Sequence, residues 1–119
     1  MDKYEFNLKV EQLNKLVKSG DYKAAMRITD TIDWSRVHNA GLLTTVSEVY
    51  EKNDEYKEAR EVLLLAYDRA PVGKRALYRL TMLAIKEGDI AEAEAYYREY
   101  IEISPQDSRK YLMEYHIAV

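Results

Sequence analysis

The chain has 119 residues and no cysteine, and 47% of its residues are hydrophobic while 33% are charged. This balance is typical of one folded, mostly helical domain, and it excludes a disordered chain, disulfide bonds, thiolate nucleophiles and zinc sites built from cysteine. The formal net charge is −3 and basic residues are scattered among acidic ones, so the sequence lacks the basic footprint of a nucleic-acid-binding protein.

The N-terminal residues do not form the apolar core of a signal peptide. The longest apolar run, 62–67, is far shorter than the roughly 18 residues that span a bilayer. We therefore expect a soluble, cytoplasmic protein with no membrane insertion.

Hydrophobic residues recur at the i, i+3, i+4 and i+7 spacing of amphipathic helices, and this pattern predicts seven helices. The first carries apolar residues from Leu8 to Val17, and the second runs from Tyr22 to Ile32. In chain order, the others are expected at about 42–53, at 56–70 before Pro71, at 74–87, at 90–103 before Pro105, and at 107–119, where Asp107 and Ser108 can cap the last helix.

Three alanines, Ala25, Ala59 and Ala93, stand 34 residues apart, and each follows a similar turn sequence. A period of 34 in a helical sequence predicts pairs of helices that stack into a solenoid. We expect a single helical-repeat domain over 1–119, as a whole protein or as a piece of a longer one. Its predicted parts are repeats at about 6–37, 40–73 and 74–106 and a final helix at about 107–119.

The middle repeat has large and small residues in a fixed order, namely Leu43, Val46, Ser47, Tyr50, Ala59, Leu63, Ala66 and Pro71. This order resembles the tetratricopeptide repeat family. The next repeat keeps Leu77, Leu80, Thr81, Ala84, Ala93, Tyr97 and Pro105, but it has Tyr100 where the family favours a small residue. The first repeat departs from the pattern at Gln12, Leu13, Thr29 and Ile32. The resemblance implies an all-α fold, a right-handed α-α superhelix of about three helical hairpins plus a C-terminal helix.

Small residues of the pattern are expected in the core, because a small side chain lets two helices approach closely. Ala59 and Ala93 take this role on the second helices, and Ser47 and Thr81 take it on the first helices. Tyr50, Leu63, Leu80 and Tyr97 are expected to fill the space around them.

Residues with catalytic chemistry form no recognisable motif. The two histidines, His38 and His116, lie in different repeats, and carboxylates such as Glu94 and Glu102 pair with Arg98 at helical i, i+4 spacing. The isolated glycines do not form a phosphate-binding loop. We therefore expect no enzyme activity, no cofactor and no metal.

The resemblance implies that the first helix of each repeat lines an inner, concave surface that binds a peptide or protein segment. The residues expected to bind the peptide are Asn14, Thr45, Glu48, Arg75, Tyr78, Arg79, Met82 and Met113. Their mixture of basic and apolar side chains suits a ligand with acidic and apolar side chains.

Some family members hold the C-terminal carboxylate of a chaperone in a clamp of basic and asparagine side chains. Arg75, Arg79 and Asn14 fit that clamp, whereas Thr45 stands where asparagine is expected and Val10 where lysine is expected. The alternative interpretation is that Glu48, one helix over, pairs with Arg79 and leaves Arg75 solvated, and we favour it.

A second functional hypothesis treats the chain as a scaffold or self-association domain. The last predicted helix has no hairpin partner, so its apolar side, with Tyr111, Leu112 and Tyr115, is expected to be uncovered and to allow a homodimer. The sequence does not indicate which protein is the partner.

Overall fold

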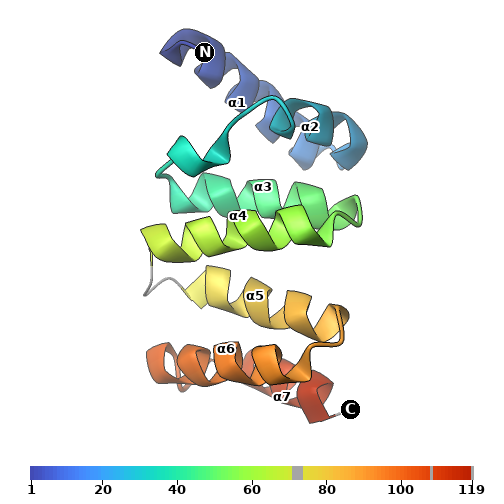
Figure 1. The fold of residues 1–119 in the computed structure, drawn as a ribbon, viewed down its shortest axis with the longest axis vertical. Helices are drawn as coiled ribbons and strands as arrows, with labels where there is room; N and C mark the ends of the chain where they lie inside the picture. Colours follow the sequence, from blue (N-terminus) through green and yellow to red (C-terminus); the bar gives the residue numbers. More distant parts are fainter. Residues whose placement is uncertain (71–73, 108, 119) are drawn as a thin grey trace.

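The chain forms a stack of helical hairpins (Figure 1). The computed structural model describes residues 1–70, 74–107 and 109–118. Pro71, Ser108 and the Tyr111 side chain, on which some sequence predictions depend, lie outside the described part. The helices are α1 (Lys3–Lys18), α2 (Tyr22–Thr29), the 3₁₀-helix η1 (Trp34–Arg36), α3 (Ala40–Lys52), α4 (Tyr56–Arg69), α5 (Lys74–Lys86), α6 (Ile90–Ile103) and α7 (Arg109–Ala118).

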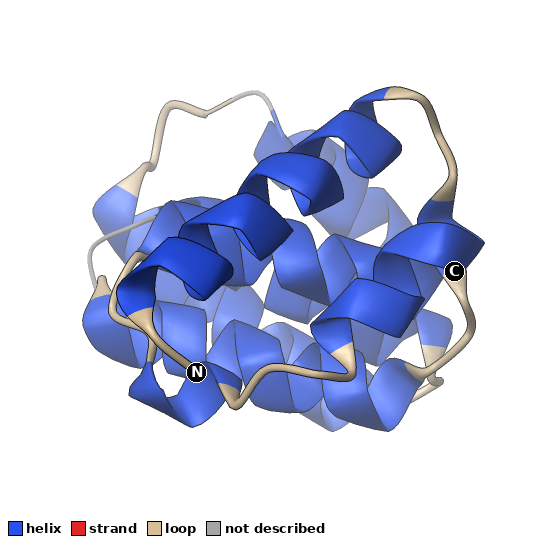
Figure 2. Ribbon diagram, turned by 90° about the horizontal axis from the view of Figure 1, so that it is seen from above, coloured by secondary structure: helices blue, strands red, loops and turns tan. Residues whose placement is uncertain are grey.

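Each hairpin packs on the next one. α3 packs on α4 and α5 on α6, while α4 also contacts α5, and α7 contacts both α5 and α6. The stack measures 44 × 25 × 22 Å. Seen from the α1 end, the described residues consist of helices joined by short connectors (Figure 2). The prediction of an all-α helical-repeat fold is therefore confirmed.

The hairpin turns repeat the same backbone conformation. Gly20 and Gly88 have φ angles of 80°, and Asp54, at the equivalent position of the middle hairpin, has a φ of 60°. Glycine adopts this left-handed region without the Cβ clash that other residues meet. The next helix then begins with a capping residue in two of the three turns, because Asp21 accepts from the Ala24 N–H and Asp89 from the Glu92 N–H.

The repeated small residues lie in the core, as predicted. Ala25, Ala59 and Ala93 are fully buried. Ser47 and Thr81 are also buried, and each hydroxyl donates to a carbonyl of its own helix, at 2.6 Å from Ser47 to Thr44 and 2.8 Å from Thr81 to Leu77. Tyr50, Leu63 and Leu80 surround them as expected, whereas Tyr97 is only half-buried.

The second helix is shorter than predicted, because it ends at Thr29 and not at Ile32. The backbone N–H groups of Thr31 and Ile32 donate to the carbonyls of Ile28 and Thr29, three residues back, so the last turn tightens and the α-helix ends. Trp34 then enters the core, where its Nε1 donates to the Thr29 carbonyl at 2.9 Å and its ring meets Phe6 edge-on. Because α2 has 8 residues and α1 has 16, the second helix covers only part of the first.

Candidate functional site

The first helices of successive hairpins are joined by side-chain contacts along one face. Glu48 on α3 contacts Arg79 on α5, and Tyr78 on α5 lies under Arg109 on α7. We call this face the inner surface, and define it by Thr45, Glu48, Arg75, Tyr78, Arg79, Met82 and Arg109.

Glu48 lies on the α3 side of the inner surface and accepts hydrogen bonds from two different helices. One of its carboxylate oxygens is 2.8 Å from the Tyr22 hydroxyl at the start of α2, and the other is 2.9 Å from an Arg79 guanidinium nitrogen. The bond to Glu48 raises the pKa of Tyr22, and burial adds to the effect. The predicted Glu48–Arg79 pair is confirmed, and Arg75 is exposed as that interpretation required.

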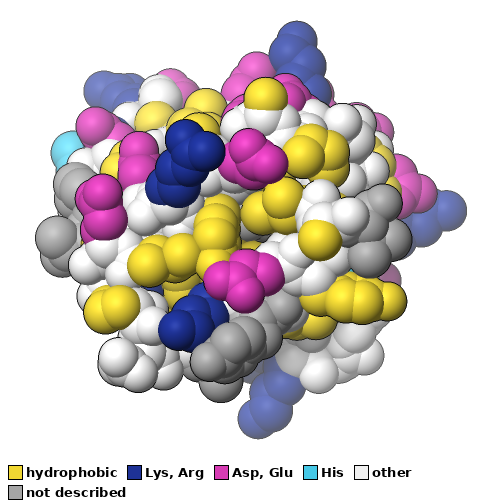
Figure 3. Space-filling view, turned by 90° about the horizontal axis from the view of Figure 1, so that it is seen from below, with side chains coloured by type: hydrophobic (Ala, Val, Ile, Leu, Met, Phe, Trp, Pro, Cys, Tyr) yellow, Lys and Arg dark blue, Asp and Glu magenta, His cyan; other side chains and the backbone are white. Residues whose placement is uncertain are grey.

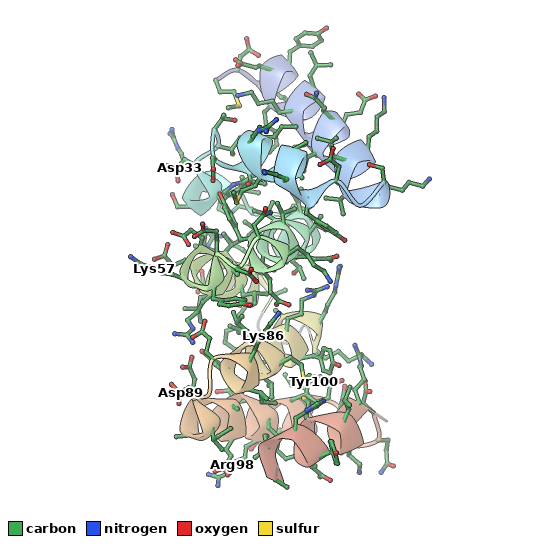
Figure 4. The ribbon with its side chains drawn as sticks, turned by 90° about the vertical axis from the view of Figure 1, so that its right-hand side faces the viewer. Asp33, Lys57, Lys86, Asp89, Arg98 and Tyr100 are labelled. Atoms are coloured by element: carbon green, nitrogen blue, oxygen red, sulfur yellow. The ribbon has the colours of Figure 1, made fainter. Side chains whose placement is uncertain are left out.

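A cluster of cations and aromatic rings lies toward the C-terminal end of the inner surface. The Arg109 guanidinium stacks 5.1 Å from the Tyr78 ring centre and 5.9 Å from the ring centre of Tyr100, which lies between α5 and α7 (Figure 4). Asp107 pairs with Arg109 at 2.9 Å and with Lys74 at 3.1 Å.

These contacts change the titration of two groups in the cluster. Hydrogen bonds from Arg109, first from its guanidinium and then from its backbone N–H, hold the pKa of Asp107 well below its usual range. Burial, followed by the nearby Asp107 carboxylate, raises the pKa of Tyr100 to about 12. The Tyr100 hydroxyl is fully buried, and within the described residues it lacks the geometry of a good hydrogen bond. Together with the exposed Arg75, Lys74 and Arg109 give this end an excess of positive charge over Asp107.

The other predicted residues differ in how available they are. Met82 and Thr45 are half-buried on the inner surface, and Asn14 is exposed on α1, which packs on α2. Met113 requires a correction, because it is fully buried and packs with Leu77 and Tyr100. α7 turns this side chain toward α5 and α6, so Met113 belongs to the core and is not available to a ligand.

A cleft of about 850 Å³ lies between the first half of α1 and the connector that precedes α3. We call it the N-terminal cleft. Among the residues that line it are the apolar Phe6, Val10, Ile32, Val37 and Leu42, and the charged or ionisable Asp2, Lys3, Asp33, Arg36 and His38. Asp33 is labelled in Figure 4 on the connector. The volume is in the range of pockets that hold small ligands or peptide side chains.

Sequence reasoning missed this cleft. One signal was present, since the break between the first two hairpins carries Trp34 and no proline, unlike the later breaks at Pro71 and Pro105. Among the described residues, no group of three or more histidine and acidic side chains is placed to hold a metal ion. No helix in the described ranges is long and apolar enough to cross a membrane.

Comparisons with known proteins find the same helical-repeat fold. The family model described as tetratricopeptide repeat matches residues 74–107. No curated protein sequence matches the chain. Among solved structures, the first TPR of Spaghetti (RPAP3) bound to the HSP90 peptide SRMEEVD has a TM-score of 0.77 and 20% identity, and the match covers 100% of this chain and 98% of that one.

Two further structures show the same likeness. The second TPR domain of human RPAP3 in complex with the HSP70 peptide SGPTIEEVD has a TM-score of 0.78 and 19% identity, covering 93% of this chain and 92% of that one. The Yersinia enterocolitica type III secretion chaperone SycD in complex with a peptide of the translocator YopD has a TM-score of 0.75 and 11% identity, covering 98% and 89%. Residues 74–107 therefore match the tetratricopeptide-repeat family model, and the chain as a whole shares the fold of solved tetratricopeptide-repeat domains.

Proposed function

We propose that the chain is a non-catalytic, cytoplasmic interaction module of a single domain, and that it binds a peptide or protein segment on its inner surface. The observation that carries the proposal is the make-up of this surface, where half-exposed Tyr78 and Met82 stand beside the cations Arg75 and Arg109. Solved proteins with the same fold, such as the first TPR of RPAP3 and SycD, bind peptides. Their likeness supports the proposal.

The chemistry of the inner surface favours a ligand with apolar and acidic side chains. Tyr78 and Met82 offer apolar area, and the charge excess at Lys74, Arg75 and Arg109 attracts carboxylates. The N-terminal cleft offers space for a larger apolar side chain. The carboxylate of Glu48 is engaged by protein donors, which supports binding over catalysis as the role of this face.

Affinity capture with matched charge reversals tests the proposal. Arg75→Glu changes an exposed cation of the inner surface. Lys57→Glu changes an exposed cation on α4, the second helix of its hairpin, which does not contribute to the inner surface (Lys57 is labelled in Figure 4). Partners captured by the wild-type chain and identified by mass spectrometry should be lost with Arg75→Glu and retained with Lys57→Glu. Equal capture by the two variants would contradict binding on the inner surface.

A second candidate function is self-association through α7. Leu112 is 44% exposed and Tyr115 is 64% exposed, and hydrophobic side chains interrupted by charged ones are visible at the C-terminal end of the stack (Figure 3). Light scattering over a range of concentrations should show a dimer that Tyr115→Lys disrupts. Tyr4→Lys is the matched control, because Tyr4 is 74% exposed at the opposite end. A wild-type chain that stays monomeric at all concentrations would refute this candidate.

A further inference from the structure

The α3 side of the inner surface already holds a carboxylate, and that carboxylate belongs to the chain itself. Both oxygens of Glu48 are engaged, one by Tyr22 and the other by Arg79, at 2.8 and 2.9 Å. The Glu48 and Arg79 side chains are 21% and 25% exposed. A ligand can therefore reach this pair, although solvent screens it less than it screens a fully exposed pair.

The neighbours of Glu48 hold this arrangement in place. Asn53 donates from its side chain to the Tyr22 carbonyl at 2.9 Å, and the Lys52 ammonium lies 5.9 Å from the centre of the Tyr22 ring. Tyr22 thereby presents its hydroxyl to Glu48 from a fixed position. Charge-assisted hydrogen bonds of the kind that Glu48 accepts are stronger than neutral ones.

A ligand carboxylate at Arg79 would have to compete with Glu48. If it displaced Glu48, the freed carboxylate would remain beside an incoming group of the same charge, and such like-charge contacts disfavour binding. Toward the C-terminal end, Asp107 already pairs with Lys74 and Arg109, whereas Arg75 is exposed and has no ion pair with another described residue.

We propose that Glu48 determines the specificity of the inner surface by occupying Arg79 as a built-in carboxylate. The surface accordingly takes an internal, uncharged stretch of a polypeptide across the Glu48–Arg79 pair and rejects a free C-terminal carboxylate there. Acidic side chains of the ligand are directed to the exposed Arg75. This inference rests on the proposed function, because it assumes that the inner surface is where the ligand binds.

The test uses the peptide SRMEEVD, which the first TPR of RPAP3 binds, in two forms, one with a free C-terminal carboxylate and one with a C-terminal amide. Binding is followed through the NMR signal of the Arg79 Nε–H group, which also reports weak complexes. The wild-type chain should respond to the acid no more strongly than to the amide. Glu48→Gln, which keeps the size of the side chain and removes its charge, should bind the acid about tenfold more tightly than the amide.

Two further variants locate the effect. Glu51→Gln removes another carboxylate of α3, one that pairs with Lys86 at 3.9 Å, and it should behave like the wild-type chain. The double variant Glu48→Gln, Arg79→Gln should show no preference for the acid. Because it lacks the Arg79 signal, its binding is measured through backbone amide signals. Far-UV circular dichroism and urea unfolding verify that every variant is folded.

Two results would overturn the inference. One is a wild-type chain that already prefers the acid, which would leave the proposed function intact. The other is a folded Glu48→Gln variant that binds the acid and the amide equally. The inference is also overturned if the Arg79 signal of this variant shifts with neither peptide. The proposed function fails on a different measurement, namely equal partner capture by Arg75→Glu and Lys57→Glu.

Discussion

Ala93→Leu is expected to destabilise the stack through overpacking between α5 and α6. Ala93 is fully buried, so the added carbons of leucine can be placed only by moving helices apart or by forcing neighbouring side chains from their rotamers. Such insertions cost about 1–3 kcal/mol. For 119 residues, an unfolding entropy of about 2.1 cal/mol/K per residue amounts to about 0.25 kcal/mol/K. The melting temperature should then fall by about 4–12 °C.

Ala95→Leu is the matched control, because it makes the same chemical change two residues along the same helix at an exposed position. Its free energy of unfolding should stay within about 0.5 kcal/mol of the wild-type value. Thermal and urea unfolding, followed by circular dichroism, measure both variants. The reasoning is refuted if the two melting temperatures agree to within about 2 °C, since burial would then not be what limits the residue size at position 93.

Three further changes test other parts of the structure. Trp34→Phe removes the indole hydrogen bond to the Thr29 carbonyl and should lower the free energy of urea unfolding by about 1–3 kcal/mol; an unchanged midpoint would contradict it. Gly88→Ala should lower the free energy of unfolding by about 1–2 kcal/mol. The loss comes from backbone strain alone, because the φ of Gly88 is 80° and no atom lies within 4 Å of an added Cβ. Asp54→Gly, at the equivalent position, should not lower it. Asp107→Asn should be most destabilising at neutral pH. The pKa of Asp107 is lower in the folded chain than its unfolded value of about 4, so the ionised carboxylate stabilises the fold above pH 4, and this stabilisation is lost as the pH falls. An Asp107→Asn effect that is equal at pH 7 and pH 3 would argue against this contribution.

Much of the fold could be predicted because its determinants are local and repeat. The spacing of Ala25, Ala59 and Ala93 marks where hairpin helices meet, and residues at equivalent positions of successive turns have the same left-handed backbone. The end of α2 could not be predicted from periodicity, since Ile28 and Ile32 continue the helical spacing. The helix ends where its backbone bonds tighten to three-residue spacing at Thr31 and Ile32 and where Trp34 enters the core and donates to the Thr29 carbonyl.

The candidate site was predictable where it depends on the repeat and not elsewhere. Glu48 and Arg79 occupy nearby positions on equivalent helices, so their pairing followed from the repeat frame. Met113 lies beyond the last repeat, where the direction of α7 is set by its packing against α5 and α6 and not by the 34-residue period. The N-terminal cleft depends on where α2 ends. Because the sequence predicted an end at Ile32 and not at Thr29, the cleft was not predicted.

The imbalance between α1 and α2 has a consequence for local unfolding. Leu13 is the sole fully buried residue among the 16 of α1, whereas α3 buries six of its 13. Segments with few buried side chains open at a small fraction of the global unfolding free energy. Backbone amides of α1 should therefore exchange their hydrogens with solvent well before those of α3. Because α1 forms one side of the N-terminal cleft, the cleft is lost whenever α1 unfolds locally, while the α3–α6 stack keeps its shape.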